Sequence, residues 1–310
     1  MTDGRVRHAD RQRKPSIIDG RSGTVVMVSI EQDDSAASSE RPVRSSKRKV
    51  RIPSLPISMK SLFFSNSGVA RGEDTVLKRH GKRWKVLSTE PNIFLIENFL
   101  SERELQYFDE QTKLKMRNFL SSYTEDEDGN RVLDERRTST FVWFQKRGSN
   151  ILKQVERRAA EMVGTHPNNV EPFQIVAYKN GQEFKAHHDM GTLDEESGAV
   201  EASDPRRLVT FFVYLNTLPE GQGHTEFPSL NLSVKPERGT ALCFPNVLVN
   251  GEPDTTTVHC AKPVSDGYTK FGMNVWITGS DLQDMADVAP ARKKAKKTRE
   301  IRSKSVDISV

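Results

Sequence analysis

The second half of the chain is a succession of short strand-like segments, and this pattern limits the fold more than any other feature of the sequence. After Pro172, apolar residues gather in runs separated by turn residues, at 173–178, 208–215, 232–235, 240–244, 256–259 and 271–277. Runs of this kind predict short β-strands. No internal repeat is visible, which argues against solenoids and propellers.

Helical signals precede the strand-rich half. Residues 93–96 read as a short apolar strand, and Ser101-Glu102-Arg103-Glu104 is a capping box that predicts a helix start. A second helix is predicted after Ser149 with Gly164 as its stop, because one face carries Ile151, Val155, Ala159 and Met162. An acidic turn is expected at 125–130, and order is expected to begin near Pro91.

The two ends of the chain are basic. Residues 1–51 carry 12 Lys/Arg and 7 Asp/Glu, and residues 291–310 carry 8 and 2, so the remainder has a net charge of 5 − 5 − 6 = −6. Residues 1–88 contain only brief apolar islands and are expected to be largely disordered. The basic clusters at 46–51 and 292–297 are consistent with three roles: a nuclear import signal, a weak contact with a polyanion, or a tail that only interacts with solvent.

Several classes of protein are excluded or disfavoured by composition. No apolar run approaches the roughly 20 residues that span a bilayer, and the N-terminus lacks the apolar centre of a secretory signal. Cys243 and Cys260 are the only cysteines, too few for a disulfide scaffold, and both are expected to be buried and inert. We therefore expect a cytoplasmic or nuclear protein without a membrane span.

The most informative motif is His187-His188-Asp189. If it is extended, the period of two places His187 and Asp189 on one face and His188 on the other. A third ligand is then needed, and only His224 and His259 lie further along the strand-rich half. Two imidazoles and one carboxylate on one face of a metal are the ligand set of non-haem Fe(II) oxygenases.

Other features support a site for a small dianion. Lys270 lies at the start of the last apolar run, and a lysine that enters a core needs an anionic partner, which a dicarboxylic co-substrate supplies. Tyr178 heads the segment that contains His187, and residues 221–227 form a turn where backbone passes close to a bound group.

From about residue 91 to 279 the chain resembles the catalytic domain of the prolyl 4-hydroxylase family of 2-oxoglutarate and Fe(II)-dependent dioxygenases. The matching blocks keep the family's order and cover roughly 60% of the chain: 96–101, 137–139, 156–158, 178–189, 207–216, 223–228, 234–239, and 259–264 followed by Lys270. Two departures stand out. His224 takes the place of an acid, which is expected to alter the substrate side of the pocket, and the segment 267–271 is one residue longer.

The resemblance implies a mainly β fold with supporting helices (α+β), whose core is a double-stranded β-helix, a cupin-like jelly roll, with disordered basic tails. It divides the chain into a disordered basic segment 1–88, a dioxygenase domain 89–280 and a basic tail 281–310. Within the domain, 89–168 is expected to be helical and 169–280 to form the β core.

The resemblance also implies roles for individual residues. His187, Asp189 and His259 would ligate Fe(II), and Lys270 with Tyr178 beside it would bind the distal carboxylate of 2-oxoglutarate. The implied reaction uses dioxygen to hydroxylate proline in a peptide or protein, releases succinate and carbon dioxide, and uses ascorbate as reductant.

Alternatives remain open at this point. One alternative is the same chemistry on another side chain, or on nucleic acid that the basic tails bind. A second alternative is a non-catalytic β-barrel binding module. Each candidate residue also has a purely structural interpretation. His187 and His259 could be core histidines, and Lys270 could be a surface lysine. Arg137 and Trp143 could be packing residues rather than the lining of a peptide groove.

Overall fold

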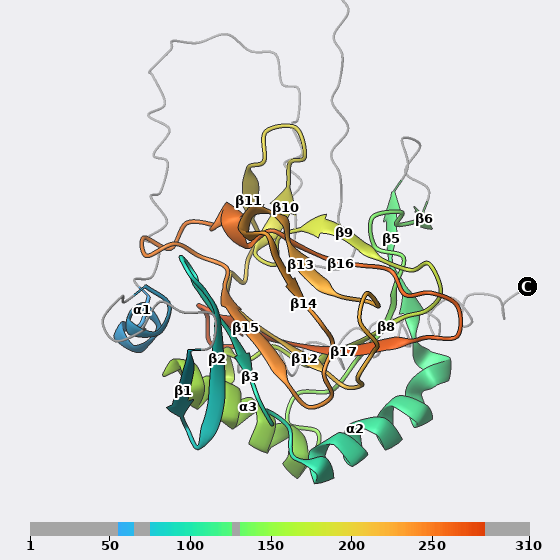
Figure 1. Ribbon diagram of the computed structural model, residues 1–310, viewed down its shortest axis with the longest axis horizontal. Coiled ribbons are helices and arrows are strands. Elements are labelled where there is room, and N and C mark those ends of the chain that lie inside the picture. Colours follow the sequence, from blue (N-terminus) through green and yellow to red (C-terminus); the bar gives the residue numbers. More distant parts are fainter. Residues whose placement is uncertain (1–54, 65–74, 126–130, 283–310) are drawn as a thin grey trace, which may run out of the picture.

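Two antiparallel sheets that face each other form the centre of the protein (Figure 1). The structure is a computed structural model that describes residues 55–64, 75–125 and 131–282. Within these residues the larger sheet has nine strands, in the order β1 (Val76–Arg79), β2 (Lys82–Thr89), β3 (Asn92–Ile96), β15 (Ala241–Pro245), β12 (Arg207–Tyr214), β17 (Lys270–Thr278), β8 (Gln174–Tyr178), β7 (Thr140–Trp143) and β4 (Leu120–Ser121).

The smaller sheet lies over the strands β15, β12, β17 and β8. Its order is β14 (Leu232–Val234), β13 (Thr225–Phe227), β16 (His259–Ala261) and β9 (Phe184–His187). Phe227 and Val234 of this sheet pack against Leu242 and Phe244 of β15, so apolar side chains fill part of the space between the sheets. The predicted mainly β, double-stranded β-helix fold with supporting helices is confirmed.

Two further hairpins stand at the same end of the molecule as the smaller sheet (Figure 1). One pairs β5 (Tyr123–Glu125) with β6 (Arg131–Leu133), and the other pairs β10 (Gly191–Leu193) with β11 (Val200–Ala202). The predicted acidic turn at 125–130 falls between β5 and β6, and all of it beyond Glu125 lies outside the described residues.

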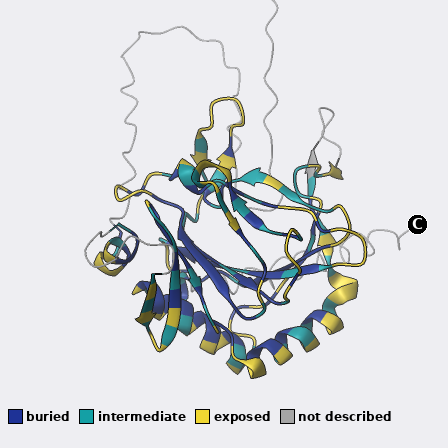
Figure 2. Cartoon of the chain, viewed as in Figure 1, coloured by how far each residue is buried: buried dark blue, intermediate teal, exposed yellow. Residues whose placement is uncertain are grey.

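Helices cover the outer face of the larger sheet. α2 (Glu102–Lys115) begins at Ser101, whose side chain accepts from the backbone of Glu104, so the predicted capping box is present. α3 (Asn150–Val163) begins at Ser149 and ends at Gly164 in the left-handed conformation, both as predicted. The outer surfaces of both helices are exposed and their inner surfaces are buried (Figure 2).

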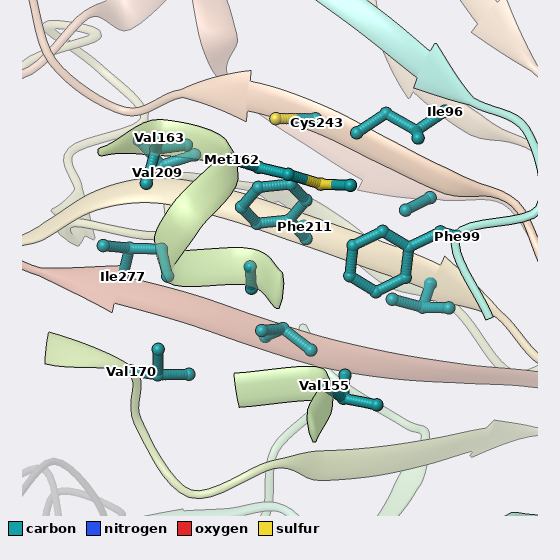
Figure 3. Packing of buried hydrophobic residues seen from close by; sticks show 14 of the residues in the cluster. Ile96, Phe99, Val155, Met162, Val163, Val170, Val209, Phe211, Cys243 and Ile277 are labelled. Carbon is teal, nitrogen blue, oxygen red and sulfur yellow. The ribbon is translucent and has the colours of Figure 1, made fainter. Parts of the chain in front are cut away.

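Alternation along the central strands separates the core from the site. In β12, Phe211 and Val213 pack with the helices, whereas Phe212 and Tyr214 face the smaller sheet. Met162 and Val163 of α3 meet Phe211 and Cys243 in the helical layer (Figure 3). Because both faces are covered, these strands read as continuous apolar runs rather than as alternating patterns.

The structure differs from the sequence-based expectation before residue 91. α1 (Ile57–Phe64), β1 and all of β2 except Thr89 lie within the segment 1–88 that was expected to be disordered, so that expectation is wrong for residues 55–64 and 75–88. Met59 and Phe63 of α1 and Trp84 of β2 are buried. These apolar side chains gain their burial from β3 and α3, which the short local segments do not reveal. The tails, with both basic clusters, lie outside the described residues.

Other predictions fail locally. Residues 89–168 are not only helical, because β3, β4 and β7 from this part join the larger sheet. The predicted strand 256–259 is instead a short 3₁₀ helix, Thr255–Thr257, because the side chain of Asp254 accepts from the backbone of Thr256 and caps it. Strand β16 starts only at His259. Among the helices of the described ranges, none has both the length and the hydrophobicity of a membrane span.

The link between α2 and α3 predicts a measurable contribution to stability. Glu104 is 4% exposed, and its carboxylate accepts from Arg158 Nη2 at 2.7 Å and Nη1 at 3.0 Å and from the backbone of Ser101 at 2.8 Å. We expect Glu104→Ala to lower the free energy of unfolding by about 2 to 3 kcal/mol. The substitution leaves the partly buried guanidinium of Arg158 without its carboxylate partner and removes the cap of α2. Urea unfolding measures this. Glu110→Ala, an exposed site on the same helix, is the control, and an equal effect in both variants would contradict the prediction.

Candidate active site

The His187-His188-Asp189 motif lies where β9 ends at the mouth of the space between the sheets. His188 points away from His187 and Asp189 into the protein, where its Nε2 donates to the carbonyl of Asp254 at 3.1 Å and its Nδ1 accepts from the backbone of Met190. The predicted alternation of the three side chains is therefore present, and His188 has a structural role.

Pairing of β16 with β9 brings in the third residue. His259 is the antiparallel partner of His187, and their ring centroids are 4.3 Å apart. His187 Nε2 is 3.9 Å from Asp189 Oδ1, and His259 Nε2 is 3.8 Å from Asp189 Oδ2. One ligand atom from each of the three residues lies within 4.8 Å of the others. The structure thus brings together these three residues, which we call the triad.

The protonation states of the triad suit a divalent metal. Nδ1 of His187 is 2.8 Å from the carbonyl of Lys185, and Nδ1 of His259 is 3.0 Å from that of Thr257. A proton on each Nδ1 leaves both Nε2 lone pairs directed at the centre, as in metal sites. Burial and the neighbouring His259 hold the pKa of His187 well below its ordinary value, so its ring is neutral at pH 7. The donor set fits Fe(II).

A hydrogen-bonded chain fixes the carboxylate of the triad. Thr210 Oγ1 donates to Asp189 Oδ2 at 2.6 Å and accepts from Asn246 Nδ2 at 2.9 Å. Burial opposes ionisation of Asp189, but the two imidazoles and Arg207 together hold its pKa below the ordinary value. The carboxylate is therefore ionised and held in one orientation.

Lys270 starts β17 opposite Tyr178 of β8, and its side chain is fully buried. Its Nζ donates to Thr225 Oγ1 at 3.3 Å and lies 5.1 to 5.7 Å from the ring centroids of Phe212, Tyr178 and Tyr214. None of the described carboxylates forms an ion pair with it, and burial lowers its pKa to about 7. Lys270 is thus a core lysine with aromatic neighbours, not a surface lysine.

Tyr178 is 3% exposed and, with Phe212 and Thr225, lines a cavity in front of Lys270. Burial raises the pKa of Tyr178, so its hydroxyl stays protonated. The cavity has a volume of about 1200 Å³ and also contains the triad. Tyr178 and the triad therefore border the same space, and the side chain of Lys270 lies behind the lining residue Thr225, to which it donates.

The close backbone approach predicted for 221–227 occurs at Gly223, but it is to Lys270. A Cβ on Gly223, which has φ +60°, would lie 3.2 Å from Lys270 Cδ and 2.9 Å from Val264. The imidazole of His224 lies against its own turn, with Nδ1 2.8 Å from Ser233 Oγ and Nε2 accepting from the backbone of Gly221. The expectation that His224 alters the substrate side of the pocket is wrong, because this ring is used to close the turn and does not line the cavity.

Sequence reasoning missed several cavity residues. Arg207 binds Glu171 through two hydrogen bonds of 2.7 and 3.0 Å and lies 3.5 Å above the ring of Trp276. Trp276 is six residues after Lys270, and a period of two counted from Lys270 would have placed it on the same face. Arg137 and Trp143 do line the cavity, and so does Cys260, which is half-buried rather than in the core.

Comparison with known proteins gives matches to oxygenases and prolyl 4-hydroxylases. Residues 173–278 match the 2OG-Fe(II) oxygenase superfamily. The chain is 29% identical over 238 residues to probable prolyl 4-hydroxylase 3 of Arabidopsis thaliana, which covers 69% of this chain and 78% of that protein. It is 31% identical over 213 residues to probable prolyl 4-hydroxylase 7 of the same plant, covering 62% and 64%.

Two further proteins match a similar share of this chain. The chain is 26% identical to human prolyl 4-hydroxylase subunit alpha-1 over 60% of its length and spans 34% of that subunit. A viral collagen prolyl hydroxylase from Paramecium Bursaria Chlorella virus-1, solved as a 2OG complex, superposes with a TM-score of 0.48, 25% identity and coverage of 61% of this chain and 96% of that chain. In its sequence matches, the chain is similar to prolyl 4-hydroxylases, and its residues 173–278 match the 2OG-Fe(II) oxygenase superfamily.

Proposed function

We propose that this protein is a dioxygenase that hydroxylates proline residues within peptides or proteins, converting 2-oxoglutarate and dioxygen to succinate and carbon dioxide. The observation that carries the proposal is the convergence of two imidazoles and one carboxylate beside a large cavity. The proline-directed part is supported by the relatives, which are named as prolyl 4-hydroxylases.

We propose that His187, Asp189 and His259 hold the Fe(II) that this family uses. When bound, Fe(II) supplies the redox chemistry that couples oxidative decarboxylation of 2-oxoglutarate to oxidation of a C–H bond. The chain's contribution is to fix three ligands on one side, so that the positions on the opposite side stay open. Phe227 and Phe244 pack 5.5 and 4.9 Å from the ring of His259 and exclude water from that side.

Lys270 is proposed to bind the distal carboxylate of 2-oxoglutarate, with Tyr178 beside it. An ammonium group in an apolar surrounding is costly until an anion pairs with it, so a dicarboxylate is favoured over a neutral ligand. Thr225 accepts from both Lys270 Nζ and the hydroxyl of Tyr214. Its own hydroxyl proton is then free to donate into the cavity that it lines.

Action in the cytoplasm or nucleus, and any contact with nucleic acid, are further proposals. They are supported only by the basic clusters at 46–51 and 292–297, which lie outside the described residues.

The first prediction from the proposed function tests the reaction itself. Purified protein incubated with Fe(II), 2-oxoglutarate, ascorbate and a library of proline peptides is expected to form succinate and a +16 Da peptide in equal amounts. Mass spectrometry locates the added oxygen on proline. Succinate formed without any modified peptide, or oxygen located on another residue, would contradict the proposed substrate.

The second prediction concerns the metal ligands. His187→Ala and His259→Ala are expected to weaken Mn(II) binding, measured by electron paramagnetic resonance, at least tenfold and to abolish succinate formation, because each removes one of three donors. His224→Ala is the matched control, since this imidazole lies outside the cavity. Unchanged Mn(II) affinity in both ligand variants would rule out the proposed metal set.

The third prediction follows from the pKa of Lys270, which burial lowers to about 7. The ammonium form dominates below pH 7 and the neutral amine above it, so the KM for 2-oxoglutarate is expected to rise above pH 7, by up to about tenfold per unit. Lys270→Met should raise this KM about tenfold or more and remove the pH dependence. Steady-state kinetics at pH 7 to 9 measure both effects. The exposed Lys179→Met is the control, and a wild-type KM that is flat over this range would contradict the assignment.

A further inference from the structure

We infer that the cavity selects proline peptides that carry lysine or arginine close to the target residue. This inference rests on the proposed peptide hydroxylation and adds a charge preference to it. It is carried by acidic side chains at the mouth of the cavity whose charge is not neutralised by the protein.

Three exposed carboxylates, here called the acidic rim, line the mouth from two sides. Glu135 follows β6, while Glu201 lies on β11 and Asp204 just beyond it. In the described part of the chain, none of the three forms an ion pair with a lysine or arginine. Asp134, next to Glu135, also lines the cavity, but it accepts from the backbone of Arg136 and of Arg137 and so closes a turn.

Most of the positive charge around the cavity is already paired. Of the three lining guanidinium groups, Arg207 binds Glu171, and Arg136 lies 3.2 Å from Glu195 on the opposite hairpin. This leaves 3 − 2 = 1 unpaired guanidinium, that of Arg137, against the four lining carboxylates outside the triad. The mouth is therefore negative, and cationic groups are attracted to it.

The floor of the cavity carries features that suit a peptide. Trp276 is 4% exposed and lines the cavity, yet its indole N–H has no acceptor among the described residues, and the same is true of Nε of Arg137. Trp143, 39% exposed, lies beside Trp276 with ring centroids 6.0 Å apart. Backbone carbonyls of an extended peptide would satisfy the two buried donors, and a proline ring packs well on indole.

The acidic rim and the aromatic floor together predict one preference among peptide substrates. A peptide that places its proline on the floor between the hairpins must pass the acidic rim with its neighbouring residues. Exposed ion pairs are individually weak, but three carboxylates act on the same ligand, so a preference of about tenfold is expected for a basic over a neutral neighbour.

The test uses peptides that differ only in charge. Residues 286–297 of this chain provide the probe, because Pro290 is its one proline and Arg292, Lys293 and Lys294 follow closely. It is compared with versions in which every Arg and Lys is replaced by Gln or by Glu. Binding is measured by fluorescence anisotropy with Mn(II) and 2-oxoglutarate, and kcat/KM for the +16 Da product is measured with Fe(II).

The expected order is basic, then neutral, then acidic, with about tenfold between the first two at low salt. The spread should shrink in 0.5 M NaCl, because screening weakens exposed charge pairs. The rim variant Glu135→Gln/Glu201→Gln/Asp204→Asn should reduce the ratio of basic to neutral peptide to within twofold. The control Glu110→Gln/Glu161→Gln/Glu252→Gln removes the same number of exposed charges elsewhere and should keep the wild-type ratio.

The outcomes separate this inference from the proposed function. Equal kcat/KM and equal affinity for the three peptides, or the same ratio in the rim and control variants, overturns the charge preference while peptide hydroxylation stands. Preferential binding of the basic peptide without any hydroxylation of proline keeps the preference and overturns the proposed reaction. Peptides that neither bind nor react overturn both.

Discussion

The site depends on one piece of strand pairing, that of β16 with β9. This antiparallel register places His259 opposite His187, so two imidazoles from positions 72 residues apart face the same carboxylate. Because side chains alternate along a strand, a shift of one residue in this pairing would turn His259 away from the centre. Backbone carbonyls two residues before each histidine, those of Lys185 and Thr257, then fix the tautomers. Neither imidazole can be oriented without the strand that carries it.

The larger sheet uses the same alternation to serve two purposes. Its outer side chains, such as Phe211 and Val275, pack with the helices and form the core. Its inner side chains include Thr210, which donates to Asp189, together with the buried lysine Lys270 and Trp276 on the floor of the cavity. A rigid helical layer thus holds the chemistry on the opposite face of the same strands.

The charged groups in the deep part of the cavity differ from those at its mouth. Deep in the cavity the carboxylate of Asp189 lies beside the two imidazoles of the triad and the guanidinium of Arg207, whereas Lys270 is buried without an ion pair to any described carboxylate. Nearer the surface, Arg207 and Arg136 are paired with Glu171 and Glu195, while the acidic rim is not paired with lysine or arginine. A small dianion and a cationic peptide therefore suit different levels of one cavity.

The amino-acid sequence alone determined what local physics controls. Side-chain caps fixed the starts of α2 and α3, apolar runs fixed the central strands, and the period of two in His187-His188-Asp189 separated the paired residues from His188. Only the tertiary structure decided which distant histidine completes the triad, that His224 closes a turn, that Trp276 and Arg207 share the cavity, and that residues before 91 join the fold. These outcomes depend on strand register and on burial by distant elements, which no short stretch of sequence encodes.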